Sequence, residues 1–149
     1  MTKATVSQSD LPIPHRDPFL FVDKVIELDQ HRILTQKQAD PEADFFKGHY
    51  PGNPVMPGVL ICESVFQAGA ILIAHRVGQA GALAGTPVLT RIKEAKFKHI
   101  VKPGQTMNVE VVFDEALGDA FFLTGRVTVE GKMVLRVTFA CMLAEEKAT

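Results

Sequence analysis

The segment 59–77 constrains the fold of this chain more than any other part of its sequence. Gly69 is its only helix breaker, and apolar side chains occupy almost every side of the helical wheel, which is typical of a buried helix. Its longest apolar stretch, residues 59–74, is shorter than a bilayer span and contains Glu63 and Gln67. In a chain of 149 residues, this pattern predicts one domain built around a central helix, with no membrane-spanning segment.

The remaining apolar runs have the pattern of strands. Before the helix, residues 19–28 and 32–38 predict two strands joined by a turn, and the segment 44–58 is too rich in proline and glycine for a regular helix or a central strand. After the helix come four β-type runs, at Val88–Lys98, Gln105–Glu115, Ala120–Glu130 and Lys132–Leu143. Short turns at 117–119 and 130–132 make the sheet largely antiparallel. The sequence therefore predicts an α+β fold, in which a mostly antiparallel sheet of five or six strands wraps one long central helix.

Composition and charge narrow the class of protein. We expect residues 1–149 to form a single domain, with residues 1–10 as a flexible polar leader that lacks the apolar segment of a signal peptide. The net charge of -1 provides no basic field for nucleic acid. Cys62 and Cys141 lie far apart among apolar residues, which is typical of reduced thiols in a cytoplasmic protein. No cluster of cysteine and histidine accompanies them, so we expect no metal site.

Glu63 is the most unusual residue of the predicted helix. Burying a carboxylate costs several kcal/mol unless the group finds polar partners or stays protonated, and a buried protonated carboxyl is a candidate proton donor. Glu63 could instead simply pair with a buried arginine or cap nearby backbone groups. Gln67 lies four residues later on the same helical face, where it could position the carboxylate or only satisfy its hydrogen bonds.

Two further candidates precede the helix or begin it. His49 lies in a loop made rigid by Pro51, Pro54 and Pro57, which can hold an imidazole in a fixed direction. Histidine titrates near neutral pH, so this ring is a candidate base, although a solvent-facing loop histidine has the same sequence signature. Gly58 stands at the helix start, where free N–H groups and the helix dipole favour a developing negative charge. A glycine that merely fits the turn explains this position as well.

Three segments carry a resemblance to a known family: PHRDPFLFVDKV at 14–25, GHYPGNPVMPGVLICESVFQAGA at 48–70 and AKFKHIVKPG at 95–104. They resemble the β-hydroxyacyl-acyl-carrier-protein dehydratases of type II fatty acid synthesis, which have the hot-dog fold. The likeness extends over most of the chain, from Leu11 to Leu143. It implies the same arrangement that the periodicity predicts, a sheet wrapped around one long helix.

The resemblance also implies a reaction and the residues that perform it. A (3R)-3-hydroxyacyl thioester would lose water to give a trans-2-enoyl thioester, without a metal or an organic cofactor. His49 would be the base that removes the Cα proton, Glu63 the acid that protonates the departing hydroxyl, and the Gly58 amide the group that polarises the thioester carbonyl. The sister hydroxydecanoyl dehydratase-isomerases carry aspartate in place of this glutamate, so Glu63 favours the simple dehydratases.

Some residues depart from the pattern of the family. Tyr50 replaces the usual phenylalanine, and Ser64 and Phe66 stand where alanine is commoner, so we expect a reshaped acyl tunnel. Phe66 is a candidate tunnel residue, unless it packs only within the core. The segment PHRDPF at 14–19 mainly anchors the N-terminus in the family, which implies a structural rather than a catalytic role for His15, Arg16 and Asp17.

The resemblance implies partners as well. In the family each site takes the histidine from one subunit and the glutamate from the other, so we expect a homodimer, which often assembles further into a trimer of dimers. The carrier protein is acidic, which makes Lys96, Lys98 and Lys102 candidate contacts, unless they only belong to an exposed strand edge.

Other functions stay open at this point. The same fold hosts acyl-CoA thioesterases and enoyl-CoA hydratases, and a dehydratase of a specialised pathway would carry the same motifs. A non-catalytic acyl-binding or scaffold subunit needs a tunnel but no acid and base, so the presence of both His49 and Glu63 speaks against it.

Overall fold

The computed structural model describes residues 10–79 and 85–145. Its elements are β1 (Lys24–Leu28), β2 (Arg32–Gln38), α1 (Asp44–Gly48), α2 (Gly58–Gln79), β3 (Thr86–Phe97), β4 (Thr106–Leu117), β5 (Ala120–Val129) and β6 (Lys132–Ala144). The leader expected at residues 1–10 lies almost entirely outside the described residues.

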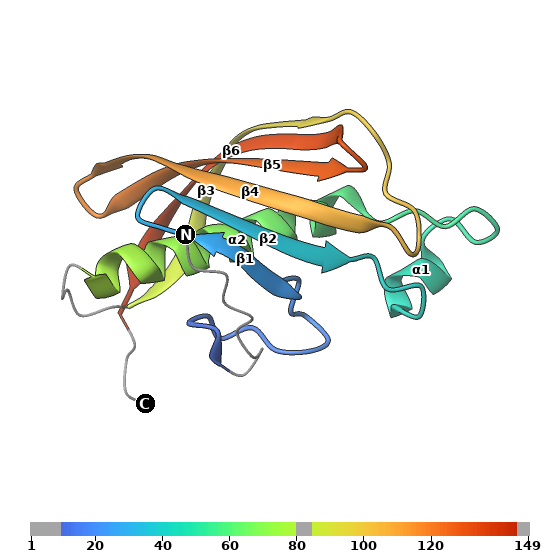
Figure 1. Ribbon diagram of the computed structural model, residues 1–149, viewed down its shortest axis with the longest axis horizontal. Coiled ribbons are helices and arrows are strands. Elements are labelled where there is room, and N and C mark those ends of the chain that lie inside the picture. The colour runs from blue at the N-terminus through green and yellow to red at the C-terminus, as the bar shows by residue number, and fades with distance from the viewer. Residues whose placement is uncertain (1–9, 80–84, 146–149) are drawn as a thin grey trace.

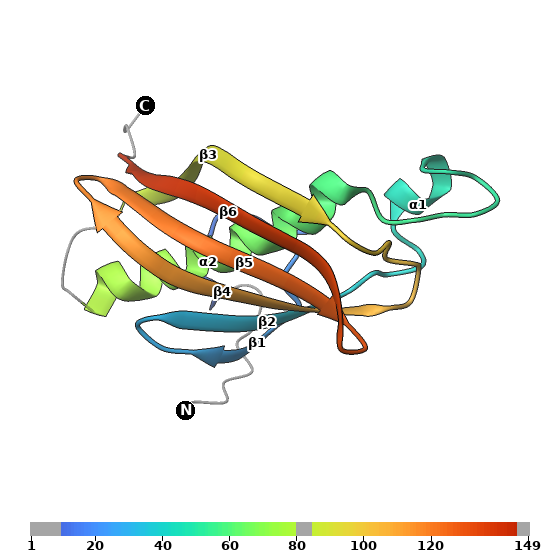
Figure 2. The ribbon, with the colours of Figure 1, turned by 90° about the horizontal axis from the view of Figure 1, so that it is seen from above.

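The six strands form one sheet in the order β1-β2-β4-β5-β6-β3. Every neighbouring pair is antiparallel. Helix α2 lies along one face of the sheet, which curves over it (Figures 1 and 2). The α+β prediction of a central helix and a mostly antiparallel sheet is therefore confirmed, with six strands.

Two expectations about the segment before α2 are wrong. The first strand begins only at Lys24, not at residue 19. The backbone before it forms a hydrogen bond with a side chain instead, since the Phe21 N–H donates to Oε1 of Gln67 at 2.7 Å. The segment 44–58 is not irregular throughout, since α1 forms one short helix at its start. The prolines of this segment come only after α1, so nothing interrupts that turn.

Helix α2 begins directly after Pro57, whose carbonyl accepts the N–H groups of Leu60 and Ile61 at 3.0 and 3.1 Å. The span Gly58–Gly78 has the length and apolar character of a membrane helix, yet 67% of its 18-residue window is buried inside the fold. Its apolar surface thus contacts the sheet, as in the core helix of a folded domain.

Two glycines allow α2 and the sheet to approach closely. A Cβ atom at Gly125 of β5 would lie 2.1 Å from Cγ1 of Val65, and one at Gly69 of α2 would lie 2.8 Å from the Phe139 ring. Real Cβ atoms do not tolerate such distances, so the backbone and the facing side chains occupy space that any larger residue would need.

We expect Gly125→Ala to destabilise the protein by about 1–3 kcal/mol, because the new methyl overpacks a closed helix–sheet contact. Denaturant unfolding measures the loss. Gly78→Ala is the matched control, since Gly78 lies in the same helix as Val65 with open space around its Cα and is exposed. An effect at Gly125 as small as that of the control would show that the sheet yields easily here.

Strand β3 is the last strand of the sheet and pairs only with β6. All residues from 88 to 97 are exposed, although several are apolar. The side chains of Val88, Leu89, Ile92 and Phe97 are between 36% and 51% exposed. An edge strand with this composition is an unusual surface for a single chain in water.

Candidate active site

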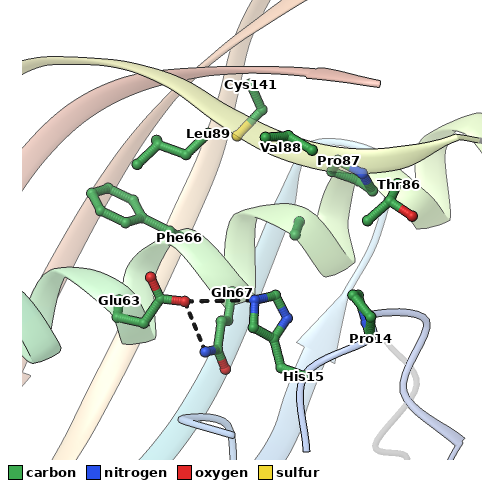
Figure 3. A pocket seen from close by; sticks show the side chains of 11 residues that line it. Pro14, His15, Glu63, Phe66, Gln67, Thr86, Pro87, Val88, Leu89 and Cys141 are labelled. Atoms are coloured by element: carbon green, nitrogen blue, oxygen red, sulfur yellow. Dashed lines mark hydrogen bonds and ion pairs between the residues drawn. The ribbon is translucent and has the colours of Figure 1, made fainter. Parts of the chain in front are cut away.

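A pocket of about 250 Å³ lies between the segment before β1, helix α2 and the N-terminal end of β3 (Figure 3). Its wall is largely apolar and includes Phe66, Val88 and Leu89. Its polar groups include those of His15, Glu63 and Gln67, so one end of the pocket is lined by groups that exchange protons or donate hydrogen bonds.

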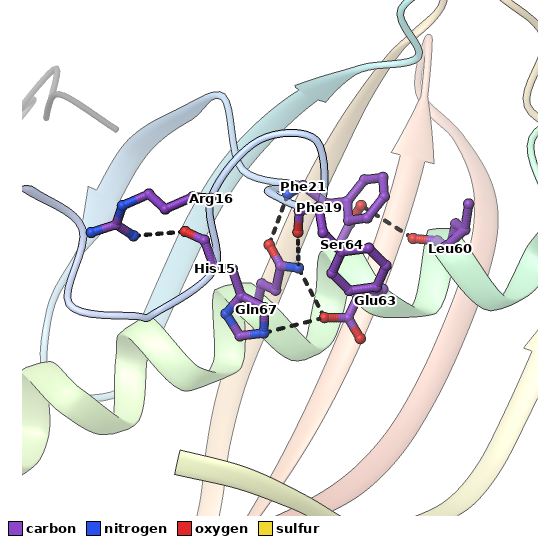
Figure 4. A network of polar contacts seen from close by, with 8 residues as sticks. All are labelled: His15, Arg16, Phe19, Phe21, Leu60, Glu63, Ser64 and Gln67. Carbon is purple, nitrogen blue, oxygen red and sulfur yellow. Dashed lines mark hydrogen bonds and ion pairs between the residues drawn. The ribbon is translucent and has the colours of Figure 1, made fainter. Parts of the chain in front are cut away.

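Gln67 is almost fully buried, at 1% exposure, and all its hydrogen bonds are satisfied. Its Oε1 accepts the Phe21 N–H at 2.7 Å, and its Nε2 donates to the Phe19 carbonyl at 2.9 Å and to Oε2 of Glu63 at 2.8 Å (Figure 4). A flipped amide would place oxygen against the Phe19 carbonyl, so the backbone fixes which atom faces Glu63. The structure thus places Gln67 where it positions the Glu63 carboxylate.

Glu63 has a second neighbour that the sequence did not reveal. Nε2 of His15 lies 3.7 Å from the same Oε2 atom (Figures 3 and 4). His15 belongs to the segment that was expected only to anchor the N-terminus. Its position at the pocket had no local sequence signal, because it depends on how that segment folds back over α2.

His49 is held by its own loop. Its Nδ1 lies 2.8 Å from the Val55 carbonyl, and its ring stacks on Tyr50 with a centroid distance of 4.4 Å. Because a carbonyl can only accept, Nδ1 carries the proton, and Nε2 of the neutral ring has a free lone pair. This is the tautomer that a general base needs. His49 does not line the pocket of Glu63 in its own chain, so one chain does not bring the two residues together there.

Gly58 is the first residue of α2, and helix geometry leaves its N–H without an intrahelical acceptor. A Cβ at this position would lie 3.0 Å from the Phe97 ring. Glycine therefore allows the Phe97 ring to pack closely against the start of α2.

The remaining candidates from the sequence occupy mixed environments. Phe66 lines the pocket and also packs edge-on against Phe139 at 5.0 Å between ring centroids, so it belongs to both the pocket wall and the core. Lys96, Lys98 and Lys102 are all exposed, and Lys96 pairs with Glu94 at 3.2 Å.

Both cysteines are free and buried. Burial raises the pKa of the Cys141 thiol to about 12, and burial together with the charge of Glu63 raises that of Cys62. Both side chains are therefore neutral thiols at physiological pH, and neither is an activated nucleophile. Within residues 10–79 and 85–145, no group of three or more metal-ligating side chains is found.

Comparison with solved structures defines the fold. The fold matches the dehydratase heterocomplex ApeI:P from Xenorhabdus doucetiae with a TM-score of 0.79 and 13% identity, over 92% of this chain and 91% of that one. It also matches a hypothetical thioesterase with coenzyme A from Streptococcus pneumoniae, with a TM-score of 0.64 and 10% identity over 84% and 88% of the two chains. The chain therefore has the hot-dog fold.

Sequence comparison is more specific. A FabA-like domain matches residues 13–138, and the chain belongs to this family. It is 38% identical to the 3-hydroxyacyl-[acyl-carrier-protein] dehydratase FabZ of Rickettsia massiliae, over 90% of this chain and 92% of that protein. It is 40% identical to the FabZ of Oenococcus oeni, over 86% and 91% of the two chains. The family resemblance inferred from the motifs is confirmed.

Proposed function

We propose that the protein dehydrates (3R)-3-hydroxyacyl-acyl-carrier-protein to trans-2-enoyl-acyl-carrier-protein in fatty acid biosynthesis. The observation that carries this proposal is the Glu63 carboxyl, fixed by Gln67 at the polar end of an otherwise apolar pocket. Membership in the FabA-like family and the similarity to FabZ proteins support the same reaction. A tunnel that only bound acyl chains would need no such group.

The reaction follows from the chemistry of three groups. The free lone pair of His49 Nε2 takes the proton from the substrate Cα, and the electron pair moves toward the thioester oxygen, which the Gly58 N–H stabilises. The C–O bond to the hydroxyl then breaks as Glu63 gives it a proton, and water leaves. His49 ends protonated and Glu63 ionised, so solvent returns one proton and removes the other before the next turnover.

This mechanism needs a second subunit, because His49 does not line the pocket of its own chain. We propose a homodimer in which each site combines His49 of one subunit with Glu63 of the other. The exposed, partly apolar β3 edge supports it, since two copies of this strand can pair around a twofold axis and bury those side chains. Further assembly into a trimer of dimers remains part of the proposal.

The acyl carrier protein is the proposed partner of this dimer. Its acidic surface would meet Lys96, Lys98 and Lys102, which are exposed beyond or at the end of β3. We place the reaction in the cytoplasm, where Cys62 and Cys141 stay reduced.

Product analysis tests the function. Purified protein is incubated with (3R)-3-hydroxyacyl chains of several lengths on a carrier protein, and the products are resolved by mass spectrometry. We expect a loss of one water with the thioester intact. Release of free acid and carrier thiol would instead make the protein a thioesterase, and an unchanged substrate would make it a binding protein.

Phe66→Ala is expected to act on both specificity and stability. The variant lengthens the pocket, so kcat/KM should shift toward longer acyl chains by up to about 0.8 kcal/mol for each added methylene that becomes buried. Loss of the packing against Phe139 should cost about 3–5 kcal/mol of stability. Phe66→Leu, which keeps more of the volume, is the control. A constant ratio of kcat/KM between short and long substrates would assign Phe66 to the core alone.

A further inference from the structure

Two donors converge on one oxygen of Glu63. The amide of Gln67 reaches Oε2 at 2.8 Å, and the imidazole of His15 reaches the same atom at 3.7 Å. Among the described residues, both polar contacts of Glu63 fall on Oε2, and Figures 3 and 4 show the other oxygen pointing away from both donors. The carboxyl is therefore held asymmetrically, with Oε1 left for the substrate.

The surroundings of His15 favour one tautomer of its neutral ring. Its Nδ1 is buried and has no hydrogen-bond partner, whereas Nε2 faces the carboxyl. A proton on Nδ1 would be a buried donor without an acceptor, which is costly. The neutral ring is thus favoured with its proton on Nε2, where the N–H points toward Oε2 as a donor.

The ring itself is kept in place by the segment that carries it. His15 stacks on Phe19 at 6.4 Å between centroids, and the backbone of Phe19 and Phe21 is tied to Gln67. The guanidinium of Arg16 bonds the carbonyls of Ile13 and His15 at 2.7 and 2.6 Å. The segment before β1 therefore orients both donors toward the same carboxyl.

We propose that His15 is a positioning residue for Glu63: its Nε2–H and the Gln67 amide hold Oε2, so that Oε1 carries the proton given to the departing hydroxyl. At 3.7 Å the contact is longer than a hydrogen bond. The proposal requires this contact to shorten as Glu63 loses its proton, because a hydrogen bond to the ionised carboxylate is stronger than one to the neutral acid. The inference rests on the proposed function and adds a residue that the anchoring role of its segment did not suggest.

Three substitutions at position 15 distinguish the role of the hydrogen-bond donor from that of the shape of the side chain. His15→Phe keeps a ring that can stack on Phe19 but removes the donor, whereas His15→Gln keeps an N–H near the place of Nε2. His15→Leu matches the size of the glutamine variant without its amide. His31→Phe makes the same change at an exposed position that does not line the pocket, and serves as the control. Thermal unfolding of each variant checks the fold.

We expect His15→Phe and His15→Leu to lower kcat about 10- to 100-fold, the range for a hydrogen bond to a charged group, with KM within about threefold. His15→Gln should stay within about fivefold of the wild type, and His31→Phe should be unchanged. If the phenylalanine variant does not fold, the glutamine and leucine variants give the same comparison.

Three results would overturn the positioning role: normal kcat in the donor-free variants, a change in KM alone, or an equal loss of kcat with glutamine and leucine. These outcomes are distinct from failure of the proposed function. If the proposed function were wrong, the wild-type protein itself would not dehydrate the substrate, or Glu63→Gln would leave the rate unchanged.

Discussion

Glu63→Gln and His49→Ala are each expected to lower kcat by about 10²–10⁴-fold, the usual contribution of a general acid or base. The glutamine keeps the size of the side chain that Gln67 contacts but cannot give a proton to the departing hydroxyl. The alanine removes the imidazole whose Nε2 has the free lone pair, together with its hydrogen bond to the Val55 carbonyl. Steady-state dehydration rates with a carrier-bound substrate measure both losses.

Both variants should remain folded and keep the oligomeric state of the wild type, since neither position supports the core. Size-exclusion chromatography and thermal unfolding provide this control. A folded variant that retained near-normal turnover would exclude its residue from the acid–base pair, and the pocket would need another proton donor or base.

The second large effect concerns the arrangement of the two residues between subunits. His49→Ala and Glu63→Gln chains, each inactive alone, should recover activity when they are mixed and allowed to exchange subunits. A mixed dimer has one site with both lesions and one site with none, so equal mixing is expected to restore about a quarter of the wild-type sites.

Each variant incubated with itself is the control, and labelled chains verify that exchange has taken place. Mixed dimers that stay inactive would mean that each site uses His49 and Glu63 of the same chain, or that the two residues do not act together in one site. Because the activity is expected to rise from almost none to that of about a quarter of the wild-type sites, the measurement does not depend on small differences in rate.

Much of the fold could be predicted from hydrophobic periodicity. The run of apolar residues over Val59–Val77 predicted α2 to within two residues of its observed ends. Alternation in the later strands predicted β4 to β6 almost as well, because one face of each must contact the helix. The predicted strand boundary was wrong where the backbone forms a hydrogen bond with a side chain. Residues 19–22 have a strand-like sequence, but the Phe21 N–H donates to the Gln67 side chain.

The candidate site was predictable in part for a different reason. Glu63 and Gln67 stand out because polar residues in a buried helix are costly, and they share a helical face. His15 has no such signal: it lies in a loop, and only the path of that loop across α2 brings it to the carboxyl. Long-range placement of loop residues depends on tertiary contacts that local sequence patterns do not encode.

The exposed edge of β3 also affects how the protein behaves before it assembles. A lone chain presents a strand of 12 residues with free backbone groups and apolar side chains, and any other unpaired strand can add to it. Pairing with a second copy removes that edge from competition. In the proposed dimer, the contact that completes the active site would therefore also protect newly made chains from aggregation, and selection for catalysis and for solubility would act on the same strand.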